Sequence, residues 1–153
     1  MLSVISPAPY LDAIGLYRET ARCKPHIQRT IALQIARAVT VGFLMDDRLI
    51  AVIGFYPAGA TREEVFLCGV GADVLGQHMV ALARACRLIL SSRFQDGITE
   101  LTGYVREGHR PGQRLARLAG FSRAEKPVEF HGHERWDLTH NEQRREFAVR
   151  WSE

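Results

Sequence analysis

The pattern of apolar positions changes character in the middle of the chain. Val65 to Cys68 is an unbroken apolar run, which is typical of a strand covered on both faces. Gly69-Val70-Gly71 interrupts this run, and apolar side chains then recur every three or four residues behind Asp73, a good helix N-cap residue. The stretch therefore predicts a strand, a glycine-bearing turn and a long helix from Asp73 to Phe94.

The segments before this strand predict two helices and a meander of strands. In chain order we expect a strand at 3–6, a helix at 10–22, a helix starting at Pro25, and strands at 38–45 and 48–56. Leu11 is among the side chains expected to face inward from the first helix. Asp46-Asp47 is a turn signal, so the last two strands are expected to form a hairpin.

The segments after the long helix predict more strands and one short helix. We expect a strand at 98–105, a helix from Gln113 to Ala119 that ends at Gly120, and a strand starting at Phe121. Apolar and polar residues alternate strictly from Val128 to Leu138, which indicates a strand with one buried face.

This element order predicts an α+β (mixed α/β) fold. We expect a central, mixed but mostly antiparallel sheet of six or seven strands, with about four flanking helices and a parallel pair near the long helix. The domain is expected to span 1–138, followed by a charged helix or tail at 139–153. Phe147 and Trp151 lie on one side of that helix, and we expect them to dock on the domain itself or on a protein partner or second copy.

Composition narrows the function classes. The 153 residues are 46% hydrophobic and 24% charged, as in a soluble globular protein, and the longest apolar stretch is cut by Arg84 and Arg87, so no membrane association is expected. A net charge of +3 suits an anionic ligand but makes nucleic-acid binding unlikely. The three cysteines form no CxxC and His131 and His133 lack a third ligand, so we expect a cytoplasmic protein without a metal.

The turn at Gly69–Gly71 is also a candidate anion site. A strand–turn–helix connection leaves free backbone N–H groups at the positive end of a helix, which can bind a phosphate. An ordinary structural connection explains the same pattern, because loose glycine patterns are weak signals.

Several features together resemble the GNAT superfamily of acyl-CoA N-acyltransferases. Leu118-Ala119-Gly120-Phe121 is similar to the Leu-Gly-Phe that closes the family's fourth helix, and the Asp46-Asp47 hairpin and the strand–turn–helix stretch lie where the family has them. The resemblance extends in element order to Leu138. It implies transfer of an acyl group from acetyl-CoA or another acyl-CoA to an amine-bearing substrate.

The resemblance also implies a set of cofactor-binding residues. They lie at the turn, at the start of the long helix and on the short helix: Cys68, Gly69, Val70, Gly71, Gly76, Gln77, Arg110 and Arg114. A strand N–H near Cys68 or Gly69 would polarise the thioester carbonyl. Arg110 and Arg114 form a stripe with Arg117, which is equally typical of a solvated helix face.

Three residues are candidates for proton transfer. Glu64, beside Glu63, could take a proton from the amine, although a solvated pair of carboxylates explains both residues. Tyr104 could donate to the leaving thiolate, or be a half-buried sheet tyrosine. His109 could be an acid or base, or could cap the short helix.

The sequence also departs from the family pattern. The pyrophosphate motif of Gln or Arg, two residues, Gly, one residue and Gly or Ala is not matched, and only Gly76 falls near its place. Ala116 stands where a catalytic Tyr is common and His109 where an Asn is common. Because Asp73 would repel a pyrophosphate, we expect weak or absent CoA binding. The alternative is a catalytically silent assembly protein similar to phage internal virion proteins, located in the virion.

Overall fold

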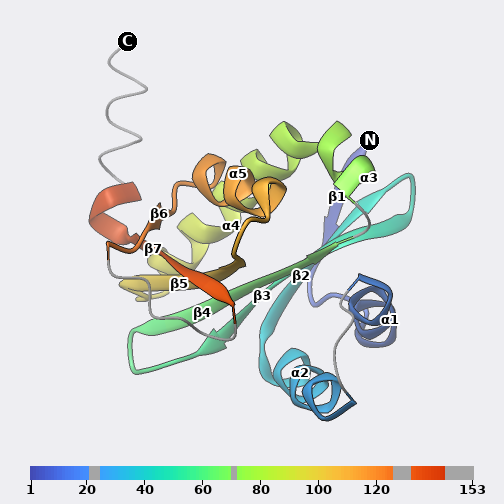
Figure 1. The fold of residues 1–153 in the computed structure, drawn as a ribbon, viewed down its shortest axis with the longest axis horizontal. Coiled ribbons are helices and arrows are strands. Elements are labelled where there is room, and N and C mark those ends of the chain that lie inside the picture. Colours follow the sequence, from blue (N-terminus) through green and yellow to red (C-terminus); the bar gives the residue numbers. More distant parts are fainter. Residues whose placement is uncertain (21–24, 70–71, 126–131, 144–153) are drawn as a thin grey trace. The chain divides into compact units, whose positions relative to one another are not determined.

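The computed structural model describes residues 1–20, 25–69, 72–125 and 132–143 (Figure 1). Within these residues, seven strands form one sheet in the order β1-β2-β3-β4-β5-β7-β6. The strands are β1 (Leu2–Ile5), β2 (Val39–Met45), β3 (Arg48–Pro57), β4 (Arg62–Gly69), β5 (Glu100–Arg106), β6 (Ser122–Arg123) and β7 (His133–Thr139). The helices are α1 (Tyr10–Thr20), α2 (Pro25–Arg37), α3 (Ala72–Gln77), α4 (Met79–Gln95) and α5 (Arg110–Leu118). The expected α+β fold with a mostly antiparallel sheet is confirmed.

The chain divides into two compact units. The first contains Met1–Tyr56 and Val65–Met79, and the second contains Pro57–Glu64 and Val80–Glu153. Strand β4 contributes residues to both. The domain boundary expected after residue 138 stays a prediction, and Phe147 and Trp151 lie outside the described residues.

The first unit is built around the β2–β3 hairpin. Asp46 and Asp47 both have positive φ, 50° and 63°, as a two-residue type I′ turn requires, which confirms the hairpin. Val52 of β3, Cys68 of β4 and Leu16 of α1 belong to one buried cluster. Leu11, expected to face inward, is 80% exposed, so that prediction is wrong.

The second unit packs α4 and α5 against one face of its strands. Leu82 and Leu90 of α4, Leu101 of β5 and Leu138 of β7 are at most 1% exposed. The alternation expected in the last strand is confirmed for the described residues 133–138. The buried face of this strand also carries one charged residue, Glu134, whose carboxylate lies 2.9 Å from the Arg123 guanidinium.

Three predictions around the central turn are wrong. The single helix expected from Asp73 to Phe94 is two helices, because the chain turns at His78, whose N–H bonds to the Leu75 carbonyl at 3.1 Å. Since α3 begins at Ala72, Asp73 lies in its first turn and is not the N-cap. Strand β4 is not covered on both faces, because Leu67 is 37% exposed.

The start of the C-terminal helix is fixed by a capping box. The Thr139 N–H donates to Glu142 Oε2 at 3.0 Å, and the Glu142 N–H donates to Thr139 Oγ1 at 3.3 Å. Residues 140–143 are helical, and the His140 ring stacks on Phe94 at 5.2 Å. A helix therefore does begin after Thr139, as expected. Among the described helices, none is long and apolar enough to cross a membrane.

Helix α5 begins and ends with defined caps. It starts at Arg110, three residues earlier than expected, because His109 caps it and Pro111 is tolerated in a first turn. At its end, the Gly120 N–H bonds to the Arg117 carbonyl at 3.0 Å and the Phe121 N–H to the Ala116 carbonyl at 2.9 Å. This is a Schellman motif, and Gly120 supplies the positive φ of 101° that it needs.

We predict opposite effects for two glycine-to-alanine substitutions. Gly120→Ala should lower the free energy of unfolding by about 1 to 2 kcal/mol, because an L side chain is strained at this φ. Gly15→Ala, inside α1 where an added methyl group would meet no atom within 4 Å, should raise it by about 1 kcal/mol. Urea unfolding measures the free energy of unfolding of both variants. Equal changes in the two variants would contradict the Schellman motif at Gly120.

Candidate active site

The two adjacent glutamates of β4 have different environments. Glu63 is 5% exposed, and its carboxylate binds the Arg93 guanidinium through two hydrogen bonds of 2.8 and 2.7 Å. Arg93 also lies 3.3 Å from Asp96. The interpretation of Glu63 as a solvated strand-end carboxylate is therefore wrong. It is a buried partner that links β4 to α4.

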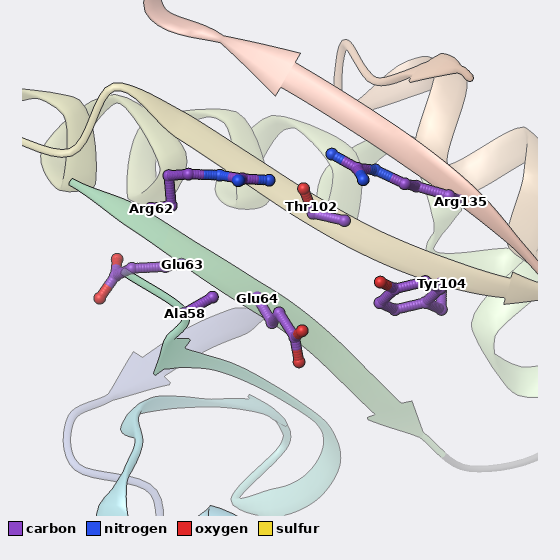
Figure 2. Close-up of a pocket in the computed structure, with 7 residues that line it drawn as sticks. All are labelled: Ala58, Arg62, Glu63, Glu64, Thr102, Tyr104 and Arg135. Carbon is purple, nitrogen blue, oxygen red and sulfur yellow. The ribbon is translucent and has the colours of Figure 1, made fainter. Parts of the chain in front are cut away.

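Glu64 contributes to a pocket that lies entirely within the second unit. Successive strand residues point to opposite faces, and Figure 2 shows the carboxyl groups of Glu63 and Glu64 pointing in different directions. The pocket has a volume of about 140 Å³. It is lined by Ala58, Arg62, Glu63, Glu64, Thr102, Tyr104 and Arg135. Within the described part of the chain, the Glu64 carboxylate has no hydrogen-bond or ion-pair partner.

A network of ion pairs crosses three strands at this pocket. The Glu100 carboxylate binds Arg62 Nε at 3.2 Å through one oxygen and Arg135 Nη2 at 3.2 Å through the other. The Asp137 carboxylate accepts from Arg135 Nε at 2.9 Å and from the Thr102 hydroxyl at 2.8 Å. The hydrogen bond to Asp137 raises the pKa of Arg135 above its ordinary value, so this guanidinium stays charged.

Tyr104 lies next to the positively charged Arg135 of this network. Tyr104 of β5 lies opposite Arg135 of β7 in the antiparallel register, and both line the pocket with Glu64. Two of the three expected proton-transfer residues, Glu64 and Tyr104, therefore share one pocket. A carboxylate and a phenol at one site are suited to accept one proton and donate another.

His109 lies at the N-terminus of α5 and does not line this pocket. Its Nδ1 accepts a hydrogen bond from the Gly112 N–H at 3.2 Å, so the capping role considered from the sequence is confirmed. Burial and, to a smaller extent, the Arg106 charge lower the pKa of His109. A catalytic role for His109 stays a prediction.

Comparison with solved structures identifies the architecture, although no family model and no curated protein matches the sequence. An IAA acetyltransferase from Bacillus cereus has a TM-score of 0.69 at 13% identity, and the match covers 91% of this chain and 99% of that one. An aminoglycoside acetyltransferase in complex with coenzyme A and kanamycin has a TM-score of 0.68 at 16% identity, covering 95% of this chain and 98% of that one. A GNAT family acetyltransferase from Elizabethkingia anophelis with acetyl-CoA bound has a TM-score of 0.65 at 13% identity, covering 90% and 97%.

The chain has the GNAT fold. The resemblance stated from the Gly-Phe helix, the hairpin and the strand–turn–helix order is confirmed at this level. At these identities the likeness concerns the fold and leaves the activity to be argued from this chain's own residues.

The residues expected to hold acyl-CoA on this GNAT fold are divided between the two units. Those in the first unit are Cys68, Gly69, Gly76 and Gln77, and those in the second are Arg110 and Arg114. Val70 and Gly71 lie outside the described residues. Burial raises the pKa of the Cys68 thiol to about 11, so this side chain is inert and can contribute through its backbone alone.

The end of β4 is closely packed by α3. A Cβ at Gly69 would meet Leu75 Cδ1 at 2.7 Å and the Ile50 carbonyl oxygen at 3.3 Å. A larger residue at position 69 would displace the Leu75 side chain and crowd the Ile50 carbonyl, so glycine fits this packing whether or not a ligand binds there. The glycine signal in the sequence has a structural explanation in addition to the functional one.

The arginine stripe on α5 has two parts. All three arginines are exposed, but only the Arg117 guanidinium makes an aromatic contact among the described residues, lying 5.4 Å from the centre of the Trp136 ring in a cation–π contact. The first two arginines thus remain candidates for binding an anion, and Arg117 has a structural role. Within the described ranges, no three His, Cys, Asp or Glu side chains are grouped to hold a metal ion.

Sequence reasoning missed most of the ion-pair network. Glu100, Thr102 and Tyr104 alternate along β5, and Arg135 and Asp137 alternate along β7, so each set lies on one strand face. That alternation in the sequence could have indicated a polar face on each strand. The register that places Thr102 opposite Asp137 and Tyr104 opposite Arg135 was not contained in it.

We predict that removing the partner of Glu63 is strongly destabilising. Arg93→Met leaves a buried carboxylate unpaired and should lower the free energy of unfolding by about 3 kcal/mol. Arg84→Met, on an exposed position of the same helix, is the matched control and should change it by less than about 0.5 kcal/mol. Chemical denaturation measures both, and similar values for the two variants would show that the pair is not important.

We predict a pH-dependent stability that originates at His109. Because folding lowers the pKa of His109 from 6.5, the unfolded chain binds the proton first as the pH falls. The contribution is fully present above pH 6.5 and is lost as the pH falls through the folded pKa. His109→Asn keeps a capping side chain without titrating. In urea unfolding between pH 7.5 and 5.5, this variant should lose less stability than the wild type, and equal losses would exclude His109 as the source.

Proposed function

We propose that this protein is an acyl-CoA-dependent N-acyltransferase. The proposal rests on one observation: Glu64 and Tyr104 line the same pocket of a chain with the GNAT fold. Among the described residues, the Glu64 carboxylate has no hydrogen-bond or ion-pair partner. The similar structures include proteins with coenzyme A or acetyl-CoA bound, which supports an acyl-CoA as the donor.

The proposed reaction is direct transfer to an amine. Glu64 removes a proton from the acceptor ammonium, and the free amine attacks the thioester carbonyl to form a C–N bond. Cleavage of the C–S bond then gives the N-protonated amide and a thiolate. The Tyr104 hydroxyl protonates the thiolate, the resulting tyrosinate takes the second amine proton, and Glu64 releases its proton to water. Orientation of the two reactants and proton transfer are the contributions expected of this chain.

The donor is proposed to be bound by the groups that the resemblance implies. Within the second unit, Arg110 and Arg114 would bind phosphate oxygens, because exposed guanidinium groups are good phosphate partners. The negative charge of Asp73, expected from the sequence to lie near the phosphate loop, would oppose a bound pyrophosphate. We therefore expect low affinity for the donor.

We predict that Glu64→Gln lowers kcat/KM for acetyl transfer by about 100-fold or more, because the amine then lacks its base. Tyr104→Phe should lower it by about tenfold, because water can also protonate a thiolate. Glu107→Gln, at an exposed position of the same unit, should leave it unchanged. Release of free CoA thiol from acetyl-CoA in the presence of primary amines is the measurement, and normal activity in Glu64→Gln would remove Glu64 from the mechanism.

A catalytically silent assembly module is the second candidate. It is favoured by α3, which begins directly after the turn, places Asp73 in its first turn and packs Leu75 against Gly69. Calorimetry with acetyl-CoA and with free CoA separates the candidates. Binding together with turnover supports the enzyme, whereas absence of both supports the silent module, including the phage virion role.

A further inference from the structure

The arginines of the pocket retain hydrogen-bond donors that the fold does not use. Arg62 binds Glu100 through Nε, and its two terminal nitrogens have no partner among the residues that the structure describes. Arg135 binds Asp137 through Nε and Glu100 through Nη2, which leaves Nη1 free within the same described residues. Figure 2 shows the two guanidinium groups approaching each other from β4 and β7 near Thr102.

The pocket also retains an unused acceptor. Glu64 lines the same pocket, and its carboxylate has no partner in the described part of the chain. A guanidinium group can only donate hydrogen bonds and an ionised carboxylate can only accept them. The unused groups therefore match a ligand that carries a negative group and a positive group.

The ion pairs of the arginines leave them able to bind an anion. Glu100 is shared between Arg62 and Arg135, and Asp137 also binds Arg135, so the two guanidinium groups are neutralised by two carboxylates but keep terminal N–H donors that these carboxylates do not use. The Arg62 side chain is 49% exposed, and an ion pair at such a site is weak enough to admit a second anion. The fixed fork of a guanidinium group suits a carboxylate in particular.

We propose that the acceptor substrate is a small zwitterion, with a carboxylate a few atoms from the reacting ammonium, as in an α-amino acid. The carboxylate binds the free nitrogens of Arg62 and Arg135, and the ammonium binds Glu64. This assignment of a substrate class rests on the proposed function. The volume of about 140 Å³ equals about five waters, which is enough for an amino acid of about six non-hydrogen atoms.

A binding experiment without any acyl donor tests this substrate class. The ¹⁵N-labelled protein is titrated with alanine, with alaninamide, which lacks the carboxylate, and with propionate, which lacks the ammonium, while amide chemical shifts are followed by NMR. Alanine should bind at least about tenfold more tightly than either analogue, because each analogue loses one charge-assisted contact.

Variants then assign the contacts. Arg62→Gln should weaken alanine binding about tenfold without changing the affinity for alaninamide, and Glu64→Gln should weaken both. Arg48→Gln, at an exposed position of β3, should change neither. Equal binding of alanine and alaninamide, or absence of alanine binding, overturns the inference, whereas acetyl transfer to simple amines would still support the proposed function. If alanine binds more tightly than alaninamide and propionate but no acetyl transfer is seen, the zwitterion site is supported and the proposed enzyme activity is not.

Discussion

The buried ion pair between Glu63 and Arg93 is the constraint on which the candidate site depends. It joins β4 to α4 through two short hydrogen bonds and removes a carboxylate from water, which is tolerated because the partner is charged and well placed. Because successive side chains of a strand point to opposite faces, the position of Glu63 determines the face of Glu64. With Glu63 held on the helix-covered face, Glu64 faces the pocket.

The pocket in turn depends on the register between β5 and β7. Antiparallel pairing puts Thr102 opposite Asp137 and Tyr104 opposite Arg135, so one face of two strands carries alternating donors and acceptors. Glu100 extends this pattern to Arg62 on β4. The charges on this face largely satisfy each other, and Glu64 stands apart from them as the group available for chemistry.

The sequence predicted local structure well where a single residue type determines the backbone. The Asp46-Asp47 turn and the Gly120 helix end were found because few residues accept positive φ, and both are confirmed. The split between α3 and α4 was missed because helical periodicity continues on both sides of His78. Periodicity reports which side chains are apolar and does not show a single turn between two helices.

The site was predictable in part for the same reason. Glu64 and Tyr104 were identified as chemically suitable residues on neighbouring strands, and one pocket contains both. The burial of Glu63 could not be foreseen, because its partner Arg93 lies 30 residues away. The ion-pair network follows from pairing register, which a single sequence does not specify.

The adjacency of Glu63 and Glu64 has a consequence for how this chain can change. Glu63 binds Arg93 and Glu64 faces the pocket, so two different roles occupy consecutive positions of β4. Only the alternation of side chains between the two faces of the strand keeps these roles apart. Insertion or deletion of one residue in the loop before this strand can be absorbed by that loop. The same change between Arg62 and Glu64 would put a different residue at one of the two positions, leaving either Arg93 without its anion or the pocket without its base. Length variation among descendants of this sequence should therefore stop at Arg62.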